Sequence, residues 1–281
     1  MRLDLFMVQK KLAQTRSKAQ ILIKNGQVLV NGQIANKTGL EVDNNDKVEI
    51  KGEVNPFVSK GGLKLKKAID AFNLDFSGKN VIDIGASTGG FTDCALQSGA
   101  NKVYAIDVGH GQMHSKLKNN SRVVLFEDTD FRTIDKNLIS DANFIIGDVS
   151  FISLEKLLPK ICELNINDVV LLIKPQFECG IKIAKRYKGV IKDRSVHSSV
   201  LNHIIGEFKK SGYLCNNITF SPITGGDGNI EYIAHFKKCG VECKTDTNIL
   251  IDNAFNNFGM WTCFFILRCN YFKVVDTPQK I

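Results

Sequence analysis

Five short apolar runs between residues 81 and 173 constrain the fold of this chain more than any other feature. Strands that helices cover on both faces are apolar throughout, whereas strands with one face in water alternate with polar residues. Stretches with helical character separate the runs, and this alternation is typical of parallel strands joined by crossover helices. The sequence therefore predicts an α/β doubly wound sheet, with strands at 81–84, 102–106, 123–126, 143–146 and 169–173.

A different pattern precedes this sheet. Apolar residues recur at helical spacing over 3–13 and 16–25. Two strand-like runs within 28–35 are joined by Asn31-Gly32, which favours a tight hairpin because both turn positions need a positive φ. A third alternating run follows at 47–51. These signals predict a small α+β domain in front of the sheet.

The distribution of charge supports a division into domains. The chain has a net charge of +8, and residues 1–67 hold 13 Lys or Arg against 6 Asp or Glu, whereas residues 68–281 hold 24 against 23. A basic segment of this kind is typical of a module that meets phosphate, although a solubilising basic face would have the same composition. The predicted organisation is a basic domain at 1–52, a linker at 53–60, a sheet domain at 61–236 and an unassigned extension of low order at 237–281.

A glycine-rich turn directly follows the first strand of the sheet. It reads G-x-x-x-G-G from Gly85 to Gly90, a spacing that argues against the G-x-G-x-x-G turn of dinucleotide-dependent oxidoreductases. Asp107 ends the second strand, where a carboxylate can accept hydrogen bonds from the ribose of an adenosine, and Asp128 follows the third strand. A tight strand-to-helix connection would also explain the glycines, but together with the two acids they favour S-adenosylmethionine. The candidate cofactor-binding residues are Asp83, Gly85, Ala86, Ser87, Thr88, Gly89, Gly90, Phe91, Asp107, Asp128 and Asp148.

Four charged residues stand in polar breaks or near strand ends. They are Lys64, Asp148, Lys174 and Glu231, the last within a late predicted strand. Each alone has an ordinary explanation, respectively a solvated helix face, a helix cap, a solvated strand tip and an outward strand position. They indicate a catalytic site only when taken as a set.

The first fifty residues resemble the S4 RNA-binding domain. The resemblance lies in Arg2-Leu3-Asp4, in the run from Arg16 to Gln20 and in the run from Gly26 to Gly32. In that family the second helix and its flanking loop face RNA, so the resemblance implies RNA contacts. The candidate RNA-binding residues are Arg2, Arg16, Lys18, Lys24 and Lys60.

The sheet domain resembles the FtsJ-like ribose 2′-O-methyltransferases, which carry a Lys-Asp-Lys-Glu tetrad. The runs 84–93, 148–153 and 173–178 carry the resemblance, and residues 1–236 as a whole resemble the TlyA (hemolysin A) family of ribosomal RNA methyltransferases. The resemblance implies a Rossmann-like methyltransferase fold, S-adenosylmethionine as cofactor, and ribosomal RNA or ribosomal subunits as partner, with cytidine as the target. It also implies that the four charged residues named above are catalytic.

The chemistry explains why lysines and acids would be needed. A ribose 2′-hydroxyl is a poor nucleophile and must be positioned and relieved of its proton. Lys174 is the candidate base, but a lysine with the ordinary pKa of about 10.4 would first need that pKa lowered by Lys64 and by desolvation. Alternatively, Lys174 stays charged and stabilises the developing oxyanion. Asp148 would orient Lys174, and Glu231 would fix a lysine or the sugar; the sequence leaves these roles open.

Several alternatives remain at this stage. A membrane-active cytolysin, which the hemolysin name suggests, is disfavoured because the longest apolar stretch, 259–267, is far shorter than a membrane span. An RNA-binding protein with an inactive methyltransferase fold is disfavoured by the complete tetrad. Without a signal peptide, a cytoplasmic monomer is expected. The basic loop 179–188 is either a second RNA contact or a solvated charged loop.

The cysteines do not indicate a metal site. The eight are spread over the chain and are interpreted as reduced thiols rather than as the disulfide framework of a small secreted protein. Cys239, Cys243, Cys263 and Cys269 could form a zinc site, but their spacing is loose, so no metal is expected.

Overall fold

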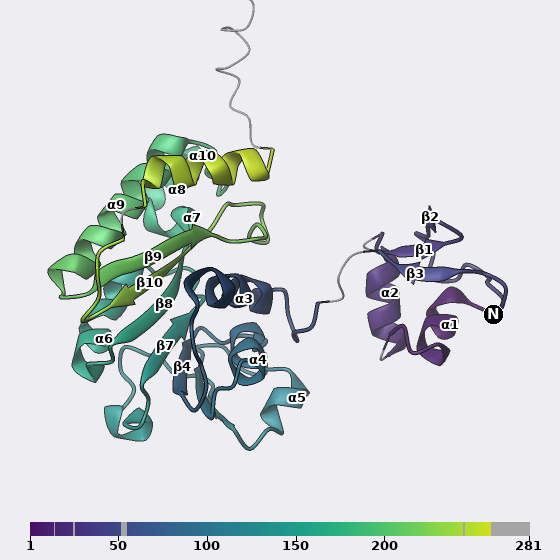
Figure 1. Ribbon diagram of the computed structural model, residues 1–281, viewed down its shortest axis with the longest axis horizontal. Helices are drawn as coiled ribbons and strands as arrows, with labels where there is room; N and C mark the ends of the chain where they lie inside the picture. The colour runs from purple at the N-terminus through teal and green to yellow at the C-terminus, as the bar shows by residue number, and fades with distance from the viewer. Residues whose placement is uncertain (14, 25, 52–54, 244, 260–281) are drawn as a thin grey trace, which may run out of the picture. The chain divides into compact units, whose positions relative to one another are not determined.

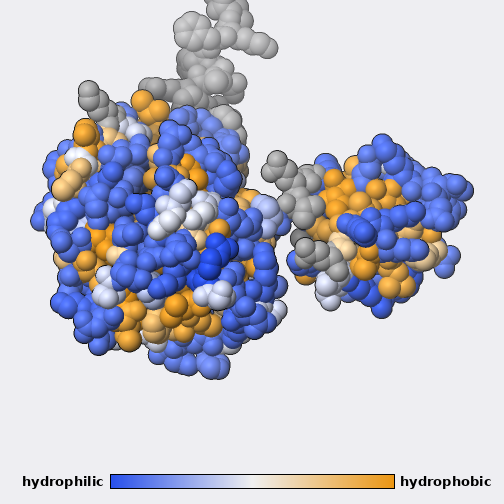
Figure 2. Space-filling view, turned by 60° about the horizontal axis from the view of Figure 1, so that its bottom comes forward, coloured by the Kyte–Doolittle hydropathy of each residue, from blue (hydrophilic) through white to orange (hydrophobic). Residues whose placement is uncertain are grey.

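The structure is a computed structural model that describes residues 1–13, 15–24, 26–51, 55–243 and 245–259. The chain divides into two compact units, the first formed by Met1–Pro56 and the second beginning at Phe57. Figure 1 shows the helices and strands that form each unit. On the face shown in Figure 2, apolar and hydrophilic residues are interspersed over both units.

The first unit consists of two helices and a small antiparallel sheet. The helices are α1 (Leu3–Gln9) and α2 (Arg16–Lys24), and the sheet has the order β2 (Gln33–Ile34), β1 (Val28–Val30), β3 (Val48–Ile50). The predicted hairpin is confirmed, because Asn31 and Gly32 connect β1 to β2 with φ values of 52° and 80°. Leu3, Met7 and Ile23 are fully buried at the centre of this unit.

The second unit is built on a seven-stranded sheet with the order β6-β5-β4-β7-β8-β10-β9. The five predicted strands are confirmed and pair in parallel, whereas β10 pairs antiparallel with both β8 and β9. The strands are β4 (Asn80–Ile84), β5 (Lys102–Ile106), β6 (Val123–Phe126), β7 (Phe144–Gly147), β8 (Asp168–Ile173), β9 (Leu214–Phe220) and β10 (Tyr232–Lys237).

Helices cover both faces of this sheet, which is why its strands are apolar throughout. Neighbouring residues of a strand enter opposite cores: Val81 lies with α3 (Gly61–Phe72) and α4 (Gly90–Gln97), whereas Ile82 lies with the helices of the other face. Those helices are α6 (Leu158–Leu164), α9 (Arg194–Lys210) and α10 (Thr247–Asn257). The remaining short helices are α5 (Ser115–Lys118), α7 (Pro175–Glu178), α8 (Ile181–Arg186) and the 3-10 turns Lys136–Ile139 and Leu154–Leu157.

Two boundaries differ from the prediction. The expectation of low order after residue 236 was wrong for α10, which Asp246 caps and which buries Leu250, Ile251, Ala254 and Phe255. Phe57–Lys60, predicted as part of the linker, lie in the second unit, where Phe57 packs against Gly62 in the core. Cys263 and Cys269 lie outside the described residues, as does the apolar run 260–267.

No helix in the described ranges is both long enough and apolar enough to cross a membrane.

Candidate active site

The turn after β4 brings the backbone unusually close to the loop after β7. Gly85 has a φ of 76°, and a side chain there would meet the carbonyl oxygen of Asp148 at 3.2 Å and the Cα of Val149 at 3.3 Å. Gly89 has a φ of 95°, and an added Cβ would collide with Leu117 and Met113. Both positions therefore require glycine, for conformation and for space.

Asp107, at the end of β5, ties this turn to the next loop. One of its carboxylate oxygens accepts a hydrogen bond from the backbone N–H of Ser87 at 2.7 Å, and the other accepts one from the N–H of Gly109 at 2.7 Å. Gln112 accepts a hydrogen bond from the Ser87 hydroxyl at 2.9 Å. Because a carboxylate offers about four lone-pair directions, Asp107 keeps acceptor capacity for a ligand.

Two cavities open at the carboxyl ends of the parallel strands. One, of about 730 Å³, lies around the loops after β4, β5 and β7 and is lined by Asp107 and Gln112. The other, of about 790 Å³, lies between the start of α3 and the loop that joins β9 to β10. Gly85, Ser87, Asp148 and Ser150 line both cavities, so they stand where the two meet.

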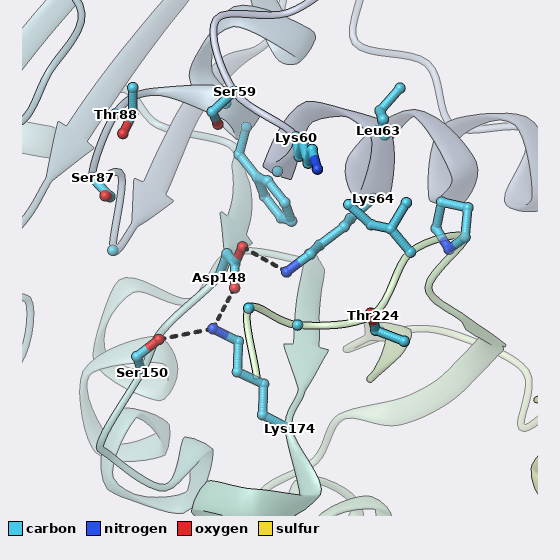
Figure 3. A pocket seen from close by; sticks show the side chains of 18 of the residues that line it. Ser59, Lys60, Leu63, Lys64, Ser87, Thr88, Asp148, Ser150, Lys174 and Thr224 are labelled. Carbon is cyan, nitrogen blue, oxygen red and sulfur yellow. Dashed lines mark hydrogen bonds and ion pairs between the residues drawn. The ribbon is translucent and has the colours of Figure 1, made fainter. Parts of the chain in front are cut away.

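The four charged residues that the sequence singled out form one cluster beside this junction, and Figure 3 shows three of them, Lys64, Asp148 and Lys174. Lys64 Nζ lies 2.7 Å from Glu231 Oε2 and 3.4 Å from Asp148 Oδ2. Lys174 Nζ lies 2.6 Å from Asp148 Oδ1 and donates a hydrogen bond to Ser150 Oγ at 2.9 Å. Asp148 thus bridges the two lysines, and four separate elements supply one connected network.

This network is shielded from water. The side chains of Lys64, Lys174 and Glu231 are 10%, 8% and 2% exposed. Burial alone would lower the pKa of Lys64, but the charges of Asp148 and Glu231 outweigh burial, and the pKa of Lys64 is raised above its usual range. Lys64 is therefore a fixed cation that holds two carboxylates in place.

Three of the predicted cofactor residues line neither cavity. Asp83 is fully buried beneath the turn, where Thr92 Oγ1 donates a hydrogen bond to it at 2.6 Å and burial raises its pKa to about 7. Gly89 packs against Leu117 and Met113 and lines neither cavity. Asp128 is exposed, adopts a φ of 53° and contacts His110 at 2.8 Å, while the neighbouring Thr129 and Asp130 line the cavity.

Comparison with known proteins identifies the chemistry that such a site serves. Residues 57–238 match the FtsJ-like methyltransferase family, and residues 1–48 match the S4 domain. The chain belongs to the FtsJ-like methyltransferase family.

Relatives of this methyltransferase share both of its parts. It is 43% identical to "Hemolysin A" of Brachyspira hyodysenteriae, over 84% of this chain and 99% of the relative. It is 36% identical to the "23S rRNA (cytidine-2'-O)-methyltransferase TlyA" of Campylobacter jejuni, over 85% of this chain and 100% of the relative. A solved structure described as a hemolysin from Streptococcus thermophilus is 37% identical and superposes with a TM-score of 0.71, covering 92% of this chain and 97% of that one.

Several residues of the methyltransferase site had not been singled out from the sequence. Gln176 donates a hydrogen bond to Glu231 Oε1 at 3.3 Å, and Phe258, just after α10, lines the larger cavity. Phe151 is 91% exposed, adopts a φ of 64° and lies 4.8 Å from the ring of Phe177. A positive φ is unusual for a bulky residue, and neither this φ nor the exposure of the ring can be obtained from the sequence.

In the first unit the predicted RNA-binding residues divide into two kinds. Arg2 and Arg16 both contact the buried carboxylate of Asp4, at 3.1 and 2.9 Å. Lys18 and Lys24 are exposed on α2. Lys60 belongs to the second unit, where it precedes α3 and lines the larger cavity.

Proposed function

We propose that this methyltransferase transfers a methyl group from S-adenosylmethionine to the ribose 2′-hydroxyl of a cytidine in ribosomal RNA. The observation that carries the proposal is the network of Lys64, Asp148, Lys174 and Glu231 at the junction of two cavities. Ribosomal RNA and cytidine follow from the activity for which the relative from Campylobacter jejuni is named. Since one chain supplies all four residues, we propose that a monomer acts, in the cytoplasm where ribosomes are made.

The smaller cavity fits the cofactor. The Gly85 turn lets a ligand lie against the backbone, and Asp107 offers acceptors for ribose hydroxyls at one end. Asp148 stands at the other end, where its carboxylate suits a positively charged sulfonium. When bound, S-adenosylmethionine supplies an electrophilic methyl group on that sulfur.

The protein's own residues would prepare the nucleophile. Lys174 and Ser150 line the larger cavity beside Asp148, so a 2′-hydroxyl placed there lies within reach of Lys174 Nζ. The hydroxyl proton would pass to Lys174 Nζ and from there to Asp148 Oδ1, 2.6 Å away, as the 2′-oxygen takes the methyl group, so that Lys174 stays charged and the carboxylate holds the proton. Lys64, held by Asp148 and Glu231, fixes the orientation of Asp148 throughout.

Two further features suit an RNA substrate. Only RNA has the 2′-hydroxyl, and single-stranded nucleotides are recognised by stacking on exposed aromatic rings. Phe151 presents such a ring three residues after Asp148. This ring lines the smaller cavity next to Ser150, where the two cavities meet, and we expect the base of the target nucleotide to stack on it there.

The test is transfer of labelled methyl from S-adenosylmethionine to ribosomal subunits. Wild type should label ribose 2′-oxygens, and Lys174→Ala should lower the rate about 10³-fold while calorimetry shows unchanged cofactor binding. Lys160→Ala is the matched control, because Lys160 is equally buried but donates to the carbonyl of Ile134, away from both cavities. Full activity of Lys174→Ala would remove Lys174 from the reaction, and RNA binding by wild type without transfer would indicate an inactive fold.

A further inference from the structure

The segment Gly180–Lys192 carries a cluster of cations that the proposed reaction does not use. Its helix, α8, buries none of its residues, and Ile181 is 74% exposed. The exposed cations of the segment are Lys182, Lys185, Arg186, Lys188 and Lys192. Among the residues that the structure describes, no carboxylate lies within ion-pair distance of any of these five.

Three cations near the amino ends of the strands are paired instead. Lys209 and Lys210, just before β9, pair with Glu242 and Glu207 at 2.9 and 2.7 Å. Lys136 pairs with Glu163 at 3.9 Å. The positive charge of Gly180–Lys192 is therefore left unneutralised by nearby acids, which favours an anionic partner.

The segment is also fixed relative to the catalytic network, unlike a loosely solvated loop. Before it, α7 begins directly after Lys174, and Gln176 of α7 donates a hydrogen bond to Glu231. Near its other end, the buried side chain of Asn229 donates to the carbonyl of Gly189 at 2.8 Å and accepts from the N–H of Ile191 at 2.9 Å. Asn229 is two residues before Glu231, so both ends of the segment are tied to the element that carries a tetrad acid.

Local contacts hold the segment itself in shape. Tyr187 donates a hydrogen bond from its hydroxyl to Asp193 at 2.6 Å, and Asp193 caps α9. The guanidinium of Arg186 lies 5.7 Å from the ring of Tyr187. A rigid, exposed and unpaired set of cations beside a nucleic-acid-modifying site is suited to phosphate groups spaced along a chain.

We propose that Gly180–Lys192 is a second RNA-binding surface, which holds the phosphates that flank the target nucleotide on the methyltransferase unit itself. This inference rests on the proposed function for its substrate. It assigns positioning of the target to the second unit, in addition to the contribution of the S4 domain.

The test compares two full-length variants that each lose four positive charges. The first variant combines Lys182→Gln, Lys185→Gln, Arg186→Gln and Lys188→Gln. The control combines Lys136→Gln, Lys209→Gln, Lys210→Gln and Lys238→Gln, which lie at the end of the sheet where the parallel strands begin. For the first variant we expect KM for ribosomal RNA to rise about tenfold or more with kcat and cofactor affinity unchanged. Binding to an rRNA fragment is also measured at several salt concentrations. The slope of log K against the logarithm of the salt concentration should become less steep by about three. The control should change neither quantity.

Each other outcome has a distinct meaning. An unchanged KM and salt slope in the first variant, or an equal change in the control, would overturn the inference. Because α8 exposes Ile181 and Ile183 beside its cations, binding to vesicles of phosphatidylglycerol and phosphatidylcholine is measured as well. Loss of vesicle binding with RNA binding intact would show that α8 faces lipid and would also overturn the inference. If wild type transfers no methyl group, the proposed function fails, while the salt slope of RNA binding still tests the surface.

Discussion

Asp4 in the first unit and Asp148 in the second each bridge two cations, but the burial of the partners is reversed. Asp4 is fully buried, and its partners Arg2 and Arg16 are 45% and 52% exposed. Around Asp148 the lysines are the buried groups, and the carboxylate, 20% exposed, is the most accessible member.

The surroundings of Asp4 and of Asp148 therefore suit different roles. In the first unit a buried acid holds two guanidinium groups toward solvent, where they can meet phosphate. In the second unit the charges line a cavity and are withdrawn from water, where electrostatic interactions are stronger. The same pairing of acid and cations thus exposes its cations in one case and encloses them beside a cavity in the other.

Among the changes that test this comparison, Glu231→Gln should have the largest effect. Lys64 would lose the closer of its two carboxylates and would draw Asp148 away from Lys174. The single-turnover rate of methyl transfer should fall about 10²-fold, with KM for RNA unchanged. Glu178→Gln is the control, since Glu178 is a partly buried acid that accepts from the N–H of Leu154 at 3.0 Å and lines neither cavity. Equal losses in both variants would show that the network has only a structural role.

A smaller effect, on stability rather than on rate, is expected from Asp4→Asn. Hydrogen bonds from Arg2 lower the pKa of Asp4 despite its burial, and Gln20 and Arg16 add to this effect. Losing these charge-assisted bonds should destabilise the first unit by about 2 kcal/mol, measured by hydrogen exchange of the α1 and β1 amides in the full chain. In wild type this stabilisation is complete above the unfolded pKa of about 3.9 and decreases as the pH falls toward the lower folded pKa. Unchanged protection in Asp4→Asn would mean that Asp4 does not support the arginines.

The third effect, on the pH dependence of stability, concerns Asp83, a buried acid that pairs with no cation in the described structure. Burial raises its pKa to about 7, so its ionisation opposes folding, and wild type should lose stability as the pH rises from about 4 to 7. The slope is at most about 1.4 kcal/mol per pH unit. Asp83→Asn, which can still accept from Thr92, should remove this slope in denaturant titrations at several pH values. Identical pH dependence in wild type and variant would contradict the assigned cause.

The sequence predicted those parts of the molecule that depend on local patterns. The covered strands and the Asn31-Gly32 hairpin each follow from a few consecutive residues, and the structure has them where expected. The antiparallel direction of β10 was not predicted, because a short apolar strand carries no signal of its direction. Helix α10 was missed although Asp246 and the apolar spacing of Leu250 and Ala254 were a readable signal.

The contacts of the candidate site depended on packing. The four charged residues were chosen by family resemblance, and their distances could not be obtained from spacing, since 167 positions separate Lys64 from Glu231. In the same way, no local pattern indicated that Arg2 and Arg16 both pair with Asp4. Nor did one indicate that Asp107 accepts hydrogen bonds from the backbone N–H groups of Ser87 and Gly109. Such shared partners arise only when distant elements meet.

The antiparallel direction of β10 has a consequence for how this site can vary. Parallel strands supply the site from their last residues, but Glu231 precedes the first residue of β10 and follows the loop from Ser221 to Ile230. Residues 222–226 of this loop wall the larger cavity, and Gly225 packs so closely on Glu231 that an added Cβ would lie 2.6 Å from Glu231 Oε1. A longer loop or a larger side chain at Gly225 would therefore change the shape of the larger cavity and the position of Glu231 together.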